Sequence, residues 1–308
     1  MYSWIGKVTK NVTLLCKIGR LCRYLPRPLL FMSLSLTGFI VYSCLRSVRQ
    51  QILLRMRELL NKRNIFSIST VCRDYFRNLI ITLYEIIIDY QFLEDSKRWR
   101  FKVEGEHFLH EALQHGRGAI VFSPHIGNFF YYYWYLSKKY PCLTVATAGS
   151  KELRPLYLSF EQLGCRGLDY DATPPVKLIK TLREHVEGGG VLFLLGDFFR
   201  PSFPAATFFG RPTRSPGGAT VLALEKQVPI VPFYGYRERG FKHRLVFHPP
   251  LFLYEELKPG QRREAMDRLN GVLEEMIHQV PGQWFYWFNT DERWEKKGTD
   301  GLSLAEQE

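Results

Sequence analysis

The chain has 308 residues, of which 46% are hydrophobic and 15% aromatic, and its formal net charge is +12. This length allows a substantial buried core, and this hydrophobic content excludes a disordered chain. The positive charge predicts an acidic partner, which would be a nucleic acid, an anionic lipid surface or an acidic carrier protein.

The N-terminal part of the chain combines basic residues with one apolar run. No Asp or Glu occurs before Glu58, and the run Leu29–Leu45 contains 17 uncharged residues, close to the roughly 20 that span a bilayer. Each Lys or Arg near an anionic surface adds about 1 kcal/mol to membrane binding. We therefore expect residues 1–47 to be a basic leader and membrane-anchoring segment on an anionic membrane surface. The alternative is a buried core helix. Because the charge surrounds an apolar run and no nucleic-acid-binding motif occurs, we expect no nucleic-acid partner.

Residues 48–296 alternate between helical and strand patterns, which is typical of an α/β domain. The pattern is helical from 48 to about 95, and a short helix is expected at 107–115. The predicted strands are 101–105 at an edge, and 119–123, 143–147, 191–195, 229–234 and 244–248. The predicted helices are 127–139, 151–163, 175–187, 217–226 and 260–279. The fold class is thus α/β, a mainly parallel sheet flanked by helices, with an N-terminal membrane-associated helical segment and a polar tail at 297–308.

A histidine follows the first buried strand pattern. The apolar run Ala119–Ser123 ends in a turn, and His125 is the first ionisable residue after it. In open α/β sheets, chemistry collects at the carboxyl ends of strands, where a histidine can take a proton from a hydroxyl near neutral pH. The alternative is a structural histidine. The next residues, Phe129–Tyr135, are all aromatic, and on a helix we expect some of these rings to meet lipid, an acyl chain or the membrane interface. The alternative for them is a densely packed hydrophobic face.

A basic, glycine-rich loop is predicted between the strand at 191–195 and the helix at 217–226. It carries Arg211 and Arg214, and Gly217 and Gly218 open the helix. Arginine side chains beside the backbone N–H groups of a helix start make an anion site. The alternative is a solvated basic loop. The six cysteines show no metal-type pairing, so we expect neither zinc nor disulfides; they are Cys16, Cys22, Cys44, Cys72, Cys142 and Cys165.

Several motifs together resemble one family, the bacterial late acyltransferases of lipid A biosynthesis, within the wider glycerolipid acyltransferases. The matching pieces, spread over residues 25 to 295, are His125-x-Gly127-Asn128, Leu195-Gly196-Asp197, Phe208-Phe209-Gly210-Arg211-Pro212, Pro229-Ile230-Val231-Pro232 and Gln283-Trp284-x-x-Trp287. The resemblance implies an O-acyltransferase at the cytoplasmic face of the bacterial inner membrane. Its co-substrate would be an acyl thioester of acyl carrier protein or coenzyme A, its acceptor a glycolipid, and no other cofactor is expected. It also implies His125 as general base, with Asn128, Gly210, Arg211 and Arg214 lining the substrate site.

The chain departs from the family motif at one position. The family has Asp or Glu five residues after the histidine, where this chain has Phe130. Our candidate for the missing acid is Asp197, because the two side chains would share one sheet edge if their strands are parallel neighbours. The alternative is that Asp197 caps its turn or pairs with Arg200. The loss of the acid also leaves open a second function, a catalytically inactive homologue that binds lipid or a protein partner.

Overall fold

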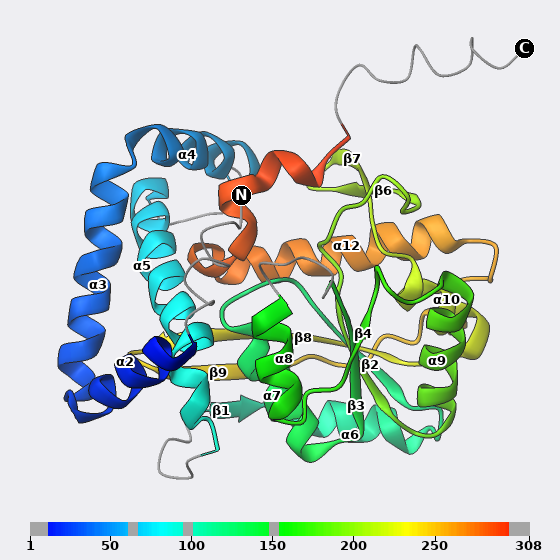
Figure 1. Cartoon of the computed structure of the whole chain (residues 1–308). Helices are drawn as coiled ribbons and strands as arrows, with labels where there is room; N and C mark the ends of the chain where they lie inside the picture. Colours follow the sequence, from blue (N-terminus) through cyan, green and yellow to red (C-terminus); the bar gives the residue numbers. More distant parts are fainter. Residues whose placement is uncertain (1–11, 61–66, 95–100, 148–153, 296–308) are drawn as a thin grey trace, which may run out of the picture.

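Helices from the N-terminal part of the chain pack beside a central sheet (Figure 1). The computed structural model describes residues 12–60, 67–94, 101–147 and 154–295. The N-terminal helices are α2 (Val12–Tyr24), α3 (Arg27–Cys44), α4 (Arg46–Leu60) and α5 (Ile68–Ile87), and the short 3-10 helix η1 (Asp89–Phe92) follows them. The predicted tail at 297–308 and the first eleven residues of the predicted leader lie outside the described residues.

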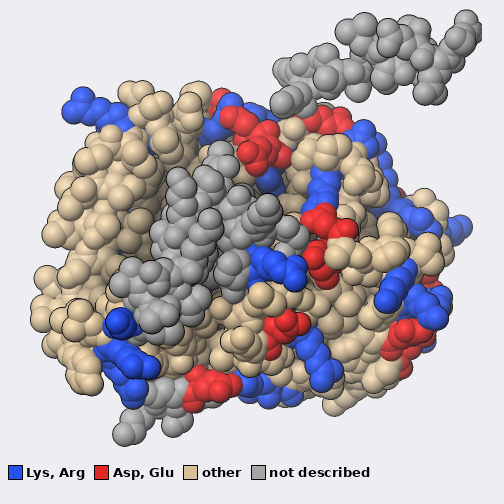
Figure 2. Space-filling view, in the orientation of Figure 1, with Lys and Arg blue, Asp and Glu red and all other residues tan. Residues whose placement is uncertain are grey.

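Helix α3 packs along α5 and leaves its other side exposed. A Cβ atom on Gly38 would come within 2.7 Å of the Arg77 Cα atom in α5, so the two backbones are in close contact. On the opposite side of α3, Met32, Leu36 and Phe39 are 64%, 60% and 50% exposed. Among the described residues, α3 is the one helix long and apolar enough to cross a membrane. Its edge of the molecule is mainly uncharged in Figure 2, with basic side chains near both ends. The alternative of a buried core helix is therefore wrong.

The central sheet has seven strands in the order β1-β9-β8-β2-β5-β3-β4, and every neighbouring pair is parallel except β8 with β9. This confirms the predicted α/β class with a mainly parallel sheet. The strands are β1 (Phe101–Glu104), β2 (Ala119–Ser123), β3 (Cys142–Ala146), β4 (Gly167–Asp169), β5 (Val191–Leu195), β8 (Ile230–Arg239) and β9 (Lys242–Phe247). We did not predict β4, because three residues are too few to show a strand pattern.

Helices cover both faces of the sheet, and alternate residues of β2 point to opposite faces. Ile120 and Phe122 pack in the core shared with α9, α10 and α12, whereas Ala119 and Val121 pack in the core shared with α6, α7 and α8. A strand buried on both faces needs a continuous apolar sequence, which is what β2 has. The helices are α6 (Glu106–Gln114), α7 (Phe129–Lys139), α8 (Arg154–Gln162), α9 (Pro175–Glu187), α10 (Gly218–Lys226), α11 (Leu253–Glu256) and α12 (Arg262–Gln279), followed by the 3-10 segments η3 (Pro281–Gln283) and η4 (Phe285–Arg293).

The aromatic run of α7 is mostly buried. The five side chains from Tyr131 to Tyr135 are buried, and only Phe129 and Phe130 are half-exposed. Burial is possible because the hydroxyl groups find partners: Tyr131 donates to the Glu85 carbonyl and Tyr135 to the Glu106 carboxylate, both at 3.0 Å. The alternative of a densely packed hydrophobic face thus describes Tyr131–Tyr135, and the prediction that some rings meet lipid, an acyl chain or the membrane interface applies only to Phe129 and Phe130.

The predicted basic loop contains a β-hairpin. Strands β6 (Ala205–Phe208) and β7 (Arg211–Arg214) pair antiparallel. Their two-residue turn has φ of 50° at Phe209 and 68° at Gly210, the left-handed pattern of tight hairpin turns. Glycine adopts this conformation readily, but phenylalanine rarely does. Of the two turn residues, only Gly210 is of a type that predicts such a turn. Pro212 argues against a strand, so the sequence did not predict β7.

Candidate active site

His125 and Asp197 meet at the carboxyl ends of two adjacent parallel strands. β2 and β5 pair with Ser123 opposite Leu195, and each strand is followed two residues later by one of the two side chains. His125 Nδ1 lies 2.5 Å from Asp197 Oδ1, and the His125 backbone N–H donates to Asp197 Oδ2 at 2.9 Å. The expected proximity of these two residues is thus present in the structure. The alternative pairing is not: Arg200 binds Asp171 at 2.6 Å instead.

The Asp197 carboxylate is buried and ionised. Its side chain is 0% exposed, whereas that of His125 is 12% exposed. Burial alone would raise the pKa of Asp197, but the attraction of His125, with hydrogen bonds from His125 and Trp284, holds that pKa below its ordinary value. An ionised carboxylate only accepts hydrogen bonds, so His125 carries its proton on Nδ1 and presents an unprotonated Nε2 when neutral.

The aromatic segment near the C-terminus completes the surroundings of the pair. Trp284 Nε1 donates to Asp197 Oδ2 at 2.7 Å, and the Phe285 backbone N–H donates to the His125 carbonyl at 2.8 Å. Tyr286 places its hydroxyl 3.3 Å from His125 Nε2, so this hydroxyl donates to the lone pair. These contacts fix both nitrogens of the imidazole ring. Sequence reasoning placed this segment in the family motif but assigned no role to Trp284 or Tyr286.

Arg293 of η4 lies next to the pair. Its guanidinium carbon is 4.0 Å from the centre of the Tyr286 ring, and its Nη1 donates to the Asp197 carbonyl at 3.3 Å. A cation over an aromatic face is attracted by the ring electrons, so Arg293 holds Tyr286 against His125.

Phe130 takes part in ring packing instead of polar contacts. Its ring centre lies 4.8 Å from that of Phe129 and 4.9 Å from that of Phe160 in α8. Phe129 in turn packs edge to face on His125 at 4.8 Å. The position five residues after His125, where the resemblance implies an acid, thus belongs to an apolar aromatic cluster in this chain.

The structure does not bring the other predicted site residues to the pair. Asn128 is 0% exposed; its side chain accepts from the Tyr131 backbone N–H at the start of α7 and donates to Glu85. Arg211 pairs with Glu58 at 3.1 Å, and Arg214 pairs with Glu295 at 2.7 Å. Gly210 lies in the hairpin turn described above. In this arrangement the side-chain charge of both arginines is neutralised by carboxylates.

A large cavity lies on the α9 side of β2 and β5, and neither His125 nor Asp197 lines it. It has a volume of about 690 Å³, within the range of about 300–1,000 Å³ typical of small-molecule sites. Its wall is mostly apolar and includes Phe122, Leu195 and Phe198, which are neighbours in sequence of His125 and Asp197. The far wall comes from α9, through Leu178 and Leu182. The described part of the chain contains no group of three or more His, Cys, Asp or Glu side chains that could hold a metal ion.

Comparison with known proteins identifies the family. The model for the bacterial lipid A biosynthesis acyltransferases matches residues 9–296. The chain belongs to this family. A search of curated proteins found no match. Membership confirms the resemblance suggested by the motifs and supports an acyltransferase of lipid A biosynthesis in general terms.

Proposed function

We propose that this protein is a membrane-associated O-acyltransferase that moves a fatty acyl group from an acyl thioester to a hydroxyl of a lipid A-like glycolipid. The observation that carries the proposal is the contact of His125 with the buried, ionised Asp197. An imidazole oriented by a carboxylate through Nδ1, which leaves Nε2 as the basic nitrogen, is the arrangement of a general base.

In the proposed reaction, His125 Nε2 takes the proton of the acceptor hydroxyl while that oxygen attacks the thioester carbonyl. A tetrahedral intermediate forms, its carbon–sulfur bond breaks, and the proton on Nε2 passes to the leaving thiolate. Asp197 stays ionised throughout and stabilises the imidazolium. The Tyr286 hydroxyl occupies the hydrogen-bond position on Nε2 that the acceptor hydroxyl needs, so we expect Tyr286 to yield this bond when the acceptor binds. No covalent acyl-enzyme is required.

We propose the cavity of about 690 Å³ as the place for the acyl chain. Burying methylene groups against Leu178, Leu182 and Phe198 is favourable by about 0.8 kcal/mol each. The donor would be acyl carrier protein or coenzyme A, and the basic chain would attract the acidic carrier. The exposed apolar side of α3 and its basic flanks would hold the protein on an anionic membrane, which we propose is the cytoplasmic face of the bacterial inner membrane.

The test compares the purified wild type with His125→Ala in detergent. Acyl carrier protein and coenzyme A, each carrying a labelled acyl chain, are offered separately, with a bacterial glycolipid extract as acceptor. We expect transfer from at least one donor by the wild type and none by the variant. If the folded wild type transfers nothing from either donor, the second candidate gains: a catalytically inactive homologue that binds lipid or a protein partner, which Phe130 favours.

A further inference from the structure

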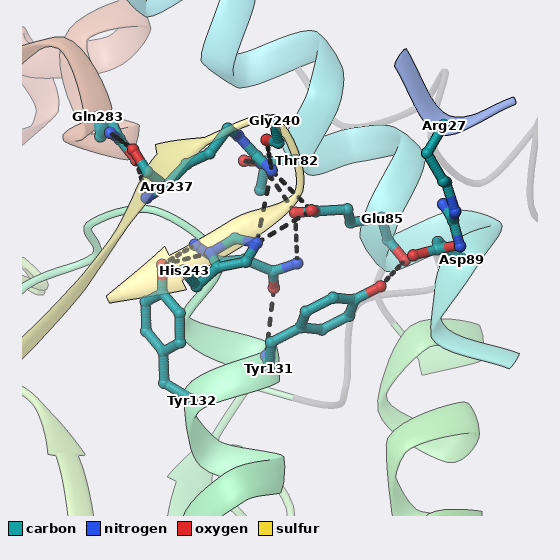
Figure 3. A network of polar contacts seen from close by, with 11 residues as sticks. Arg27, Thr82, Glu85, Asp89, Tyr131, Tyr132, Arg237, Gly240, His243 and Gln283 are labelled. Carbon is teal, nitrogen blue, oxygen red and sulfur yellow. Dashed lines mark hydrogen bonds and ion pairs between the residues drawn. The ribbon is translucent and has the colours of Figure 1, made fainter. Parts of the chain in front are cut away.

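A second group of charges is buried where α5, β8 and β9 meet (Figure 3). Glu85 of α5 accepts two hydrogen bonds from the guanidinium of Arg237 in β8, at 2.6 and 2.8 Å. His243 Nε2 of β9 lies 3.0 Å from the same carboxylate. The side chains of Glu85, Arg237 and His243 are 0%, 3% and 1% exposed.

This burial needs an explanation, because a buried ion pair is seldom more stabilising than apolar residues of the same size. Burial would raise the pKa of Glu85, but Arg237 and His243 hold it well below its ordinary value, so the carboxylate is ionised. Arg237 binds both oxygens of Glu85, but each carboxylate oxygen can accept a second hydrogen bond, and Oε2 accepts one from the loop that carries His125.

The first connection to that loop runs through Asn128. The Asn128 side-chain amide donates to Glu85 Oε2 at 3.0 Å, and the Asn128 backbone N–H donates to the Tyr132 hydroxyl at 3.0 Å. That hydroxyl also lies 3.1 Å from His243 Nδ1. The loop passes so close that a Cβ atom on Gly127, which has φ of +59°, would lie 2.3 Å from the Tyr132 hydroxyl. Asn128 is thus held through both its side chain and its backbone, three residues after His125.

The second connection runs through Arg237 and Gln283. The Gln283 side chain accepts from the Arg237 backbone N–H at 2.8 Å and donates to the Arg237 carbonyl at 2.9 Å. The Gln283 carbonyl then accepts from the Gly127 backbone N–H at 2.9 Å. The same segment continues to Phe285, which binds the His125 carbonyl. Both connections end on the loop that carries His125, the first at Asn128 and the second at Gly127.

We propose that Glu85 is a positioning residue that, with Arg237 and His243, fixes the His125 loop so that the imidazole stays aligned with Asp197. This inference rests on the proposed function for its catalytic consequence. The alignment itself is a property of the protein without substrate. Glu85 stands forty residues before His125 in the chain and reaches the loop of that histidine through Asn128.

The experiment uses three variants of the full chain. Glu85→Gln keeps the shape of the side chain but weakens its hydrogen bonds to Arg237. The double variant Glu85→Leu with Arg237→Met removes both charges of this pair, so neither is left buried without the other. Asp74→Asn is the control, because it removes an acid of the same helix whose partner is the exposed Arg77. Each variant is examined by thermal unfolding, by kcat and KM for acyl transfer, and by NMR of ¹⁵N-labelled histidine, with His125 assigned from His125→Ala.

We expect Asp74→Asn to match the wild type in all three. In the double variant we expect a folded protein with a lowered melting temperature, because the buried Asn128 and His243 side chains lose their hydrogen bonds to Glu85. We also expect a kcat lowered about 10- to 100-fold with KM nearly unchanged, and a shifted His125 signal, because small misplacements of a reacting group reduce rate by such factors. Wild-type kcat and an unchanged His125 signal in the folded double variant would overturn the proposal. The NMR result separates the two proposals: a shifted signal without any transfer by the wild type supports the positioning role and counts against the proposed function.

Discussion

Replacing Asp197 by Asn tests the catalytic proposal most directly, because the structure predicts how the amide would sit. In the wild type, Oδ2 accepts from two donors, the His125 backbone N–H and Trp284 Nε1. In Asp197→Asn the amide oxygen must stay with these two donors. If the amide were turned, its NH₂ group would point at their N–H groups, and no hydrogen bond could form. The NH₂ group then faces His125 Nδ1, which can accept its hydrogen bond only if the ring proton moves to Nε2. The variant would thus keep its shape but lose the basic nitrogen at the place where the acceptor binds.

The expected magnitude follows from this change of tautomer. In serine proteases the equivalent replacement lowers kcat about ten-thousand-fold. A loss of that size corresponds to about 5.5 kcal/mol, since each factor of ten is about 1.4 kcal/mol. We expect a similar loss in kcat for Asp197→Asn, with little change in KM for the acyl donor, because the carboxylate contacts His125 and not the cavity wall.

The assay is initial-rate acyl transfer over a range of donor concentrations. The matched control is Asp291→Asn in η4, which makes the same chemical change in the aromatic segment at a side chain that is 70% exposed and pairs with Arg55. We expect this control to keep the wild-type rate, since exposed ion pairs contribute little. Activity of Asp197→Asn within tenfold of the wild type, alongside an inactive His125→Ala, would show that Asp197 does not orient the base.

Four further outcomes follow from the same contacts. Tyr286→Phe should lower the KM for the acceptor about two- to tenfold at unchanged kcat, because the hydrogen bond from Tyr286 to His125 Nε2, worth about 0.5–1.5 kcal/mol, no longer competes with the acceptor. A collapse of kcat in the same kinetics would instead mean that the hydroxyl takes part in the chemistry. Val145→Phe fills part of the cavity, so in a competition between donors of different chain length it should shift the preference to shorter acyl chains, by about fourfold for each excluded methylene. An unchanged chain-length profile would mean that the cavity does not hold the acyl chain. Leu36→Asp with Phe39→Asp should weaken sedimentation with anionic vesicles about 100-fold, since each large apolar side chain contributes about 1.5–3 kcal/mol when buried; equal sedimentation would mean that α3 does not face the lipid. Because the pKa of Asp197 is lowered by folding, its carboxylate stabilises the fold above the ordinary pKa of about 3.9 and loses this effect as the pH falls through the lower folded value. The excess unfolding free energy of the wild type over Asp197→Asn should therefore shrink only in acid, and a decline that begins near neutral pH would contradict this.

Sequence patterns predicted the helices and strands that are marked by their own residues and the turn residues beside them. β2 and β5 begin and end where the apolar runs predicted, because each is a continuous apolar run between turn residues. α9 matches its predicted bounds, because it shows a clear helical period between prolines and glycines. The pairing of His125 with Asp197 was also expected from two strand ends. The hairpin of Arg211 and Arg214 was not, because its turn depends on Phe209 in a conformation that sequence rarely signals.

The role of Glu85 lay beyond sequence reasoning for a different reason. Its partners Arg237 and His243 are more than 150 residues away and are joined to it only by the tertiary fold. In the sequence Glu85 is one acid inside an apolar helical run, and the pattern alone predicts an exposed side chain with no particular partner. A charged residue within the buried face of a helix is itself a signal that a partner must exist, since an unpaired buried charge is strongly destabilising.

Asp197 gives His125 a carboxylate partner although Phe130 stands where the family resemblance implies an acid. β2 and β5 are in register, with Ser123 opposite Leu195, so continuing each strand by two residues brings His125 opposite Asp197. An acid at this place reaches Nδ1 from the neighbouring strand and needs nothing from α7. Residue 130 then needs no polar side chain, and Phe130 packs against Phe129 and Phe160. A carboxylate at this position would lose hydration without gaining a polar partner. Restoring the acid with Phe130→Glu should therefore lower stability without raising kcat in the wild-type background, and the single outcome that would refute this account is a gain of activity that no longer depends on Asp197.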